Sequence, residues 1–291
     1  MFKDVLVGVD GRPNGRDAIT LAALLTDPDG KLTLAHVHSG NLRPSRAVAP
    51  GMVREEQEAS HKLLEQERAA ADVKAQLRSI VSMSPGRGLH EQAEELGADL
   101  IVVGSTSHGA FGRAMLGDDT RGALNGAPCA VAIASRGYAE RAGGAGSQIA
   151  NIGVAYNGSP ESNAALALAQ DLALSTKATV HALEVVTIPT YAYAGLTALP
   201  IGENIQPMID EAKSRMKELG NVEGHAAYGL VGEELAAFGD QVDILVVGSR
   251  GYGPVKRLVL GSTSDYLQRH ARCSLLVLPR ISTSPDESSI S

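Results

Sequence analysis

The chain carries one sequence pattern twice, and this repetition constrains its fold more than any other feature. Residues 99–117 read DLIVVGSTSHGAFGRAMLG, and residues 243–261 read DILVVGSRGYGPVKRLVLG. A gapless alignment of the two segments pairs Gly104 with Gly248, Gly109 with Gly253, Arg113 with Arg257 and Gly117 with Gly261. The openings agree as well, because residues 3–25 and 151–173 each give an apolar strand, a glycine-containing turn and a helix rich in alanine and leucine. Repeats of this length predict two similar domains in tandem.

Strands alternate with helices throughout both repeats. In the first repeat we expect strands near residues 3–9, 32–37, 74–81, 100–103 and 130–134, and helices near 15–26, 53–71, 88–97 and 119–126. In the second repeat we expect strands near residues 152–156, 179–185, 223–227, 244–247 and 275–278. Since parallel neighbours need crossover helices, the alternation predicts an α/β fold of two tandem Rossmann-like domains, each with a five-stranded, mostly parallel sheet and helices on both faces.

Composition shifts mark the domain boundaries. Residues 138–148 are rich in glycine and alanine, which indicates a linker between a first domain at 1–137 and a second at 149–280. Residues 281–291 are polar and contain proline, so we expect a disordered tail.

The overall charge narrows the class of partners. A net charge of -7 argues against a nucleic-acid or membrane-surface role, because both favour a basic face. The first strand begins within a few residues of Met1 and leaves no room for a targeting signal. We therefore expect a cytoplasmic protein that acts with neither nucleic acid nor membrane.

The two cysteines, Cys129 and Cys273, occupy the same position in the two repeats, each at the start of a short apolar strand. We expect both to be small buried residues of the last strands. A disulfide would require the two strand starts to be adjacent. Neither cysteine has histidine or aspartate at metal-ligand spacing, so the sequence predicts no metal site there.

A glycine-rich segment follows the fourth strand of the second repeat. Gly248, Gly251 and Gly261 form the pattern G-x2-G-x9-G-S directly after an apolar strand. Glycines let the backbone approach a bulky polyanion, and the serine and threonine residues at 262–264 open a helix whose free N–H groups bind anions. No lysine precedes Ser262, so the segment is not a P-loop. The pattern predicts a phosphate cradle.

This segment resembles the ATP-binding loop of the universal stress protein family, and the resemblance covers nearly the whole chain. It implies a nucleotide-binding α-hydrolase type of Rossmann-like sheet in each repeat. It also implies packing about a pseudo-twofold axis with the last strands near the interface, and often further association into a homodimer. The implied ligand is ATP, while the sequence leaves ADP and AMP open as alternatives and a Mg²⁺ ion as an accompanying cofactor.

The resemblance also implies which residues bind the nucleotide. In the family, an aspartate after the first strand holds the adenosine, a valine at the end of the second strand packs on the adenine, and the glycine loop holds ribose and phosphates. The implied residues of the second repeat are Asn157, Val185, Gly248, Arg250, Gly251, Gly253, Gly261, Ser262, Thr263 and Ser264. Those of the first repeat are Asp10, Val37, Gly104, Gly109 and Gly117. Turn chemistry alone is a second explanation for Asp10 and Asn157, since both residue types favour a turn before glycine.

The two repeats differ where the phosphates would lie. The first has Ser107 in place of Gly251, and Asp118 and Asp119 in place of Ser262 and Thr263. A carboxylate about 5 Å from a phosphate charge, at an effective dielectric constant of about 20, costs on the order of 3 kcal/mol. We therefore expect ATP chiefly in the second repeat, with weak or no binding in the first unless Mg²⁺ bridges the carboxylates to the phosphates.

We expect a nucleotide-dependent regulatory module of the stress response with no catalytic residue and at most slow ATP hydrolysis. One alternative is a slow ATPase or a nucleotidyl-transferring enzyme, and another is an interaction scaffold that binds no nucleotide. Neither an HxGH nor an SGGxDS motif is present, and the second glycine loop has no carboxylate to activate water.

A few basic residues have two interpretations. Lys256 and Arg257 flank the second loop, where they would either meet phosphates or be solvated surface charges. We expect His36 to form a hydrogen bond at the end of its strand. His108, His225 and His270 show no partner pattern, and we interpret them as structural.

Overall fold

The structure is a computed structural model of the chain. It describes residues 1–39, 50–105, 122–123, 125–142, 148–187, 201–249, 257–258 and 261–279. The predicted tail at 281–291 lies outside these residues. Of the helix expected at 119–126, residues 119–121 and 124 also lie outside them, residues 122 and 123 are helical, and residues 125 and 126 form a turn.

All ten strands form one sheet, in the order β3-β2-β1-β4-β5-β10-β9-β6-β7-β8. The strands of the first repeat are β1 (Phe2–Gly8), β2 (Thr26–His38), β3 (Gln76–Val81), β4 (Leu100–Gly104) and β5 (Ala130–Ala134). Those of the second are β6 (Asn151–Ala155), β7 (Thr179–Val186), β8 (Glu223–Tyr228), β9 (Ile244–Gly248) and β10 (Ser274–Leu278). Neighbours within each repeat are parallel, which confirms the predicted five-stranded sheets.

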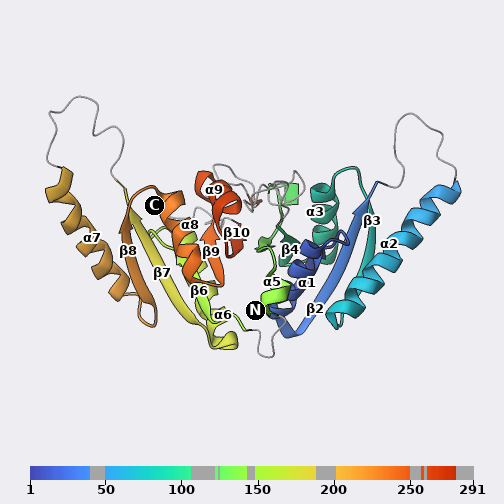
Figure 1. Cartoon of the computed structure of the whole chain (residues 1–291), viewed down its shortest axis with the longest axis horizontal. Helices are drawn as coiled ribbons and strands as arrows, with labels where there is room; N and C mark the ends of the chain where they lie inside the picture. Colours follow the sequence, from blue (N-terminus) through green and yellow to red (C-terminus); the bar gives the residue numbers. More distant parts are fainter. Residues whose placement is uncertain are drawn as a thin grey trace, which may run out of the picture.

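The last strands of the two repeats pair with each other. β5 and β10 run antiparallel, with Leu276 opposite Ala132. The two halves therefore meet edge to edge about a pseudo-twofold axis, and the outer strands β3 and β8 lie at opposite ends of the molecule (Figure 1). This arrangement confirms the expectation that the last strands lie at the interface.

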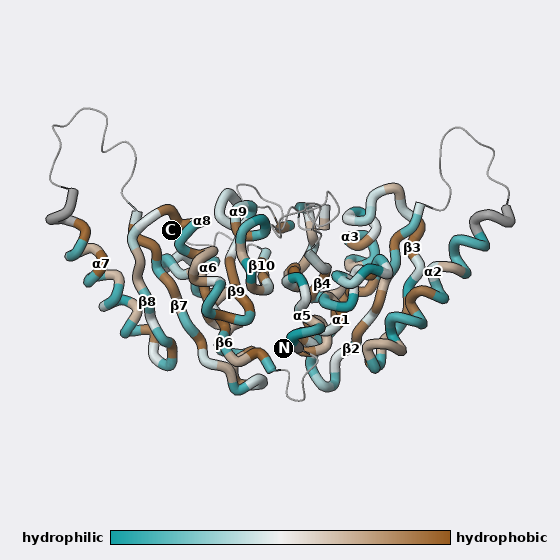
Figure 2. Tube along the Cα trace, viewed as in Figure 1, coloured by the Kyte–Doolittle hydropathy of each residue, from teal (hydrophilic) through white to brown (hydrophobic). Residues whose placement is uncertain are grey.

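Helices cover both faces of the sheet. They are α1 (Pro13–Leu25), α2 (Pro50–Ala71), α3 (Pro85–Leu96), α5 (Tyr138–Ala142), α6 (Pro160–Thr176), α7 (Ile201–Lys217), α8 (Val231–Phe238), the 3-10 turn η2 (Gly239–Gln241) and α9 (Ser262–His270). Residues of α1, α2, α6 and α7 contribute to the apolar core on one face, and residues of α3, α8 and α9 to the core on the other. Figure 2 shows apolar residues along the strands and mixed hydropathy along α2 and α7.

Alternation along the strands explains why the sheet has two cores. In β1, Val5 and Val7 belong to the first core and Leu6 to the second, because successive side chains of a strand point to opposite faces. A strand buried on both faces is continuously apolar, as the sequence of β4 shows. None of the helices in the described segments combines the length and apolar composition that a membrane crossing requires.

The start of each repeat is held by the same contact. The Asp99 carboxylate accepts hydrogen bonds from the backbone N–H groups of Lys3 and Asp4, at 2.8 and 3.1 Å. The Asp243 carboxylate accepts two corresponding bonds from Ala150 and Asn151, both at 2.8 Å. An acid before the fourth strand thus fixes the start of the first strand in both repeats.

The first part of the predicted linker at 138–148 has regular structure, because residues 138–142 form helix α5. The buried Asp17 carboxylate of α1 accepts hydrogen bonds from the backbone N–H groups of Gly137 and Ala139, at 2.9 and 2.8 Å. Free N–H groups at a helix start need such acceptors, and this one is supplied from 120 residues away in the chain. Glycine and alanine content alone gave no sign of that long-range cap.

Both cysteines are buried and free, as expected. In the antiparallel pair, Leu275 lies opposite Ile133 and Val277 opposite Val131, so Cys273 and Cys129 precede opposite ends of the β5–β10 ladder. Burial raises the pKa of each thiol to about 12. The cysteines therefore act as apolar packing residues.

A second contact between the repeats lies beside the paired strands. Leu258 and the residues Gly126 and Ala127 exchange two backbone hydrogen bonds, each 2.9 Å long. Arg257 adds an ion pair with Glu94, at 2.6 Å, and donates to the Gly126 carbonyl at 3.1 Å. Arg257 is thus a link between the repeats, whereas the sequence suggested either a phosphate ligand or a solvated charge.

Candidate functional site

Each repeat has a cavity where its strand order reverses. The order 3-2-1-4-5 reverses between β1 and β4, and the equivalent strands of the second repeat are β6 and β9. Crevices at the carboxyl ends of such strands are the usual ligand sites of open α/β sheets. The cavities of the first and second repeats each measure about 280 Å³. Size therefore does not distinguish them.

Most of the predicted residues of the second repeat line its cavity. They are Asn157, Val185, Gly248, Gly261, Ser262, Thr263 and Ser264. In the first repeat, Asp10, Val37 and Gly104 line the corresponding cavity. The remaining predicted residues, Gly109, Gly117, Arg250, Gly251 and Gly253, lie outside the described residues, as do Ser107, Asp118, Asp119, Lys256 and His108.

Helix α9 begins at the wall of the second cavity. Its cap residue, Gly261, has an extended backbone and no side chain to cap the helix. The first intrahelical bond runs from Asp265 N–H to the Gly261 carbonyl, at 2.9 Å, so the N–H groups of residues 262–264 precede the helical ladder. Free N–H groups and the helix dipole together favour an anion at this point. The Ser264 hydroxyl donates to the Gly261 carbonyl at 3.1 Å, which leaves Ser262 and Thr263 as the hydroxyls nearer the cavity surface.

The turn after the first strand has the same geometry in both repeats. Asn157 accepts a hydrogen bond from Ser159 N–H, and Asp10 accepts one from Arg12 N–H, both at 3.1 Å. The glycine that follows each residue, at 158 and 11, has a φ of +74°, which a side chain would strain. Turn chemistry therefore accounts for one oxygen of each side chain, and both residues nevertheless line their cavities.

Gly248 and Gly104 are required by the packing of a helix. A Cβ atom on Gly248 would lie 2.7 Å from the Glu161 Cβ, and one on Gly104 would lie 2.1 Å from the Asn14 carbonyl oxygen. Both contacts are with the first turn of the helix that follows the first strand, α6 or α1. We expected these glycines to admit a polyanion, but the group that approaches them in the described residues is protein.

Apolar side chains form part of the lining of each cavity. In the second repeat, Val185 lies beside Leu183, Leu235 and Val247. In the first, the corresponding part is formed by Val37, Leu89 and Val103. His36 beside Val37 is 2.7 Å from the Val9 carbonyl through Nδ1, which confirms the expected hydrogen bond at the strand end.

Sequence reasoning missed one acidic residue of the second cavity. Glu161, in the first turn of α6, lines the cavity together with Ser262 and Thr263. The equivalent residue of the first cavity is the neutral Asn14. The glycine loop itself has no carboxylate, and Glu161 comes instead from the helix after a different strand. An acid directly after Pro160 was the available signal.

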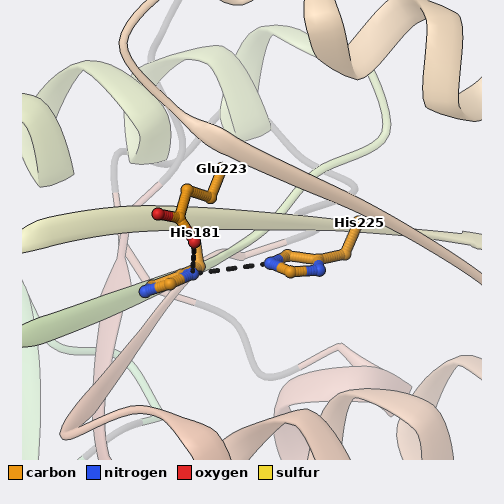
Figure 3. Close-up of side chains that lie close together, drawn as sticks. All are labelled: His181, Glu223 and His225. Carbon is orange, nitrogen blue, oxygen red and sulfur yellow. Dashed lines mark hydrogen bonds and ion pairs between the residues drawn. The ribbon is translucent and has the colours of Figure 1, made fainter.

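The interpretation of His225 as a residue without partners is also wrong. Its Nε2 lies 3.4 Å from Nδ1 of His181, and that same Nδ1 lies 3.3 Å from a carboxylate oxygen of Glu223 (Figure 3). His270 has a local structural contact instead, because its ring stacks on Tyr266 with centroids 3.9 Å apart. The missed signal was E-x-H on a strand, a spacing that places both side chains on one face.

The fold and the two cavities define a tandem, doubly wound α/β protein with a cavity at the strand-order reversal of each half. The model of the universal stress protein family matches residues 1–135 and 149–279, and the chain belongs to that family. A universal stress protein of Mycobacterium tuberculosis is 27% identical over 225 residues, which cover 74% of this chain and 72% of the relative. The crystal structure of a universal stress protein from Archaeoglobus fulgidus is 19% identical and has a TM-score of 0.65, covering 94% of this chain and 97% of that one. The latter supports the fold alone.

Proposed function

We propose that this protein binds ATP, chiefly in its second repeat, and acts as a nucleotide-dependent regulatory module of the stress response. The observation that carries the proposal is the mixed lining of the second cavity. It combines the start of α9, with Ser262 and Thr263, and apolar side chains that include Val185. A nucleotide has the same two-part chemistry, with anionic phosphates and a flat, weakly polar base.

The adenine would pack against Val185 and Leu183, which are partly or fully buried at the end of β7. The phosphates would accept hydrogen bonds from the N–H groups at the start of α9. Asn157 keeps its side-chain nitrogen available as a donor, because the turn uses only its oxygen among the bonds of the described residues. The described walls enclose about 280 Å³, close to the lower end, about 300 Å³, of typical small-molecule sites.

A preference for the second repeat follows from charge. The described lining of the first cavity includes Asp10 and Arg12, whose charged groups are 3.8 Å apart and partly neutralise each other. The hydroxyl pair Ser262 and Thr263 of the second repeat is replaced by Asp118 and Asp119 in the first. The described linings contain one acid, Glu161, in the second cavity and the Asp10–Arg12 pair in the first. The proposed preference for the second repeat therefore rests on Asp118 and Asp119, two further carboxylates that would repel phosphate.

A slow ATPase is the second candidate, and Glu161 is the observation that favours it. Phosphoryl transfer requires a metal ion or a group that orients water near the γ-phosphate. Glu161 is a carboxylate in the described lining that would share a Mg²⁺ ion with bound phosphates. A single carboxylate with no second acid beside it in that lining favours binding over turnover.

Titration calorimetry of the full chain with ATP, ADP and AMP tests the proposal. We expect about one tight ATP site per chain. Asn157→Ala should weaken it at least tenfold, whereas the matched variant Asp10→Ala should leave it unchanged. Two equal tight sites would refute the asymmetry, and no binding would favour the interaction scaffold. A steady-state turnover above about 1 per second, the low end of ordinary enzymes, would favour the enzyme instead. The expected homodimer and the cytoplasmic location remain predictions.

A further inference from the structure

Three potential metal ligands lie close together at the start of β7 and β8, at the end of the second repeat's strands opposite its cavity. His181 is the third residue of β7, and Glu223 and His225 are the first and third residues of β8. The parallel register places His181 beside Glu223, and the alternation of β8 brings His225 to the same face. Figure 3 shows the three side chains pointing toward one another.

The distances from Nδ1 of His181 to the other two ligand atoms match those between neighbouring ligands of a small tetrahedral ion. Nδ1 of His181 lies 3.3 Å from Oε2 of Glu223 and 3.4 Å from Nε2 of His225. All three ligand atoms lie within 4.8 Å of one another. Zinc–nitrogen and zinc–oxygen bonds of about 2.0–2.2 Å in a tetrahedron separate neighbouring ligand atoms by roughly 3.3–3.6 Å. An ion at the shared point would therefore require little movement of these side chains.

Asn151 orients the first histidine. The amide oxygen of Asn151 lies 3.0 Å from Nε2 of His181, so this ring nitrogen carries the proton and donates it. In a neutral ring with this tautomer, the lone pair of Nδ1 faces Glu223 and His225. A hydrogen bond of this kind to the distal ring nitrogen is the usual support of a metal-bound histidine.

With both rings neutral, His181, Glu223 and His225 direct three electron-pair donors toward one point. A neutral imidazole is the form that binds a metal ion. A carboxylate and two lone pairs that face one another repel, and a divalent cation between them offsets this repulsion.

We propose that His181, Glu223 and His225 bind a divalent transition-metal ion, with Zn²⁺ as the best match and Asn151 as a positioning residue. Two imidazoles and one carboxylate form a ligand set typical of Zn²⁺. The Glu223 side chain is 64% exposed, so water can reach the fourth position. The ion enters from solvent and requires no nucleotide.

The first repeat provides an internal control. By strand register, the positions equivalent to His181, Glu223 and His225 are Thr33, Gln76 and Arg78. Arginine carries a positive charge and offers no lone pair to a metal ion. The proposal therefore requires one such site per chain.

The experiment is a zinc titration of the metal-free full chain in the absence of nucleotide, followed by calorimetry and by thermal unfolding. We expect one Zn²⁺ per chain and a rise in Tm on zinc addition. Glu223→Gln and His225→Ala should each weaken zinc binding at least tenfold, and Asn151→Ala should weaken it by about 10- to 100-fold. His61→Ala, a change of an exposed histidine outside the cluster, is the matched control and should bind zinc as the parent does.

Cobalt provides a second readout that a purely structural role would not affect. Co²⁺ in the tetrahedral site should give the intense visible absorption of four-coordinate cobalt, and Glu223→Gln should abolish it. Because Glu223 is largely exposed, this variant keeps the proposal testable even if a histidine variant fails to fold. The proposal is overturned if the parent binds no zinc at about 100 µM, or if Glu223→Gln and His225→Ala bind it as tightly as the parent. Loss of ATP binding alone would leave it unaffected.

Discussion

Arg257 of the second repeat reaches Glu94 of the first, with Nη2 of the arginine 2.6 Å from Oε1 of the glutamate. Both side chains are 46% exposed, so the ion pair is solvent-screened. The pair nevertheless commits Arg257 to the contact between the repeats.

Arg257→Ala should lower the free energy of unfolding by about 1 kcal/mol or less, the usual value of an exposed ion pair. It should leave ATP affinity unchanged, because the guanidinium is bound to Glu94 and to the Gly126 carbonyl. Urea unfolding and ATP titration measure the two quantities. A tenfold loss of ATP affinity would show that Arg257 contacts phosphate after all.

Gly104→Ala should destabilise the fold more than Gly248→Ala. The new methyl group would meet a backbone carbonyl at 2.1 Å in the first repeat but a side-chain carbon at 2.7 Å in the second. Overpacking of this kind costs about 1–3 kcal/mol. Gly122→Ala is the control, since its nearest neighbour atom would lie 3.7 Å away. Denaturant unfolding gives the order, and equal stability of all three variants would contradict it.

Asp17→Ala should release helix α5. The change leaves two partly buried backbone N–H groups without their acceptor, at a cost below the roughly 1–3 kcal/mol that a fully buried group would incur. Hydrogen exchange should accelerate at Gly137 and Ala139. Asp17→Asn keeps one side-chain oxygen and should lose less stability than Asp17→Ala. Unchanged exchange in the alanine variant would mean that α5 docks by apolar contact alone.

Stability should fall in alkaline solution because of the buried thiols. Burial raises the pKa of Cys129 and of Cys273 from 9.0 to about 12, so above pH 9 the unfolded chain loses protons that the folded chain retains. The contribution of each thiol is thus fully present below pH 9 and is lost as the pH rises toward 12. At pH 10 the loss is on the order of 1 kcal/mol per thiol.

The double variant Cys129→Ala, Cys273→Ala isolates this effect. Its unfolding free energy should decrease less than that of the parent between pH 8 and pH 10, whatever the cost of the two small cavities. In the folded parent, both thiols should also resist alkylation at pH 8 and react only after unfolding. Parallel pH profiles of parent and variant would rule out the thiols as the cause.

The fold was predictable because its signals are local and are present twice. The apolar runs of β4 and β9 and the turns at Gly11 and Gly158 occur in the same order in both repeats, so each repeat supports the interpretation of the other. The ends of the helices were harder to predict. Helix α3 begins at Pro85 and not at Gly88 as expected, because proline is favoured in the first turn of a helix.

The features that sequence reasoning missed all depend on contacts between distant segments. Glu161 reaches the second cavity from the helix after β6, and Asp17 caps a helix that lies 120 residues further along the chain. His181 and His225 meet only because β7 and β8 pair in one particular register. The spacing of apolar residues indicates which face of an element a side chain occupies, but it does not indicate which other segment packs against that face.

In the antiparallel pairing of β5 with β10, each half of this protein covers the edge strand of the other half. Either strand alone would present a row of unpaired N–H and C=O groups flanked by apolar side chains, which is a template for uncontrolled strand addition. A single repeat expressed alone would therefore need another strand to pair with its exposed edge, most simply the same strand of a second copy. Joining two repeats in one chain supplies that partner at a high local concentration from the moment of synthesis, and it allows the two cavities to diverge in sequence while the shared edge remains closed.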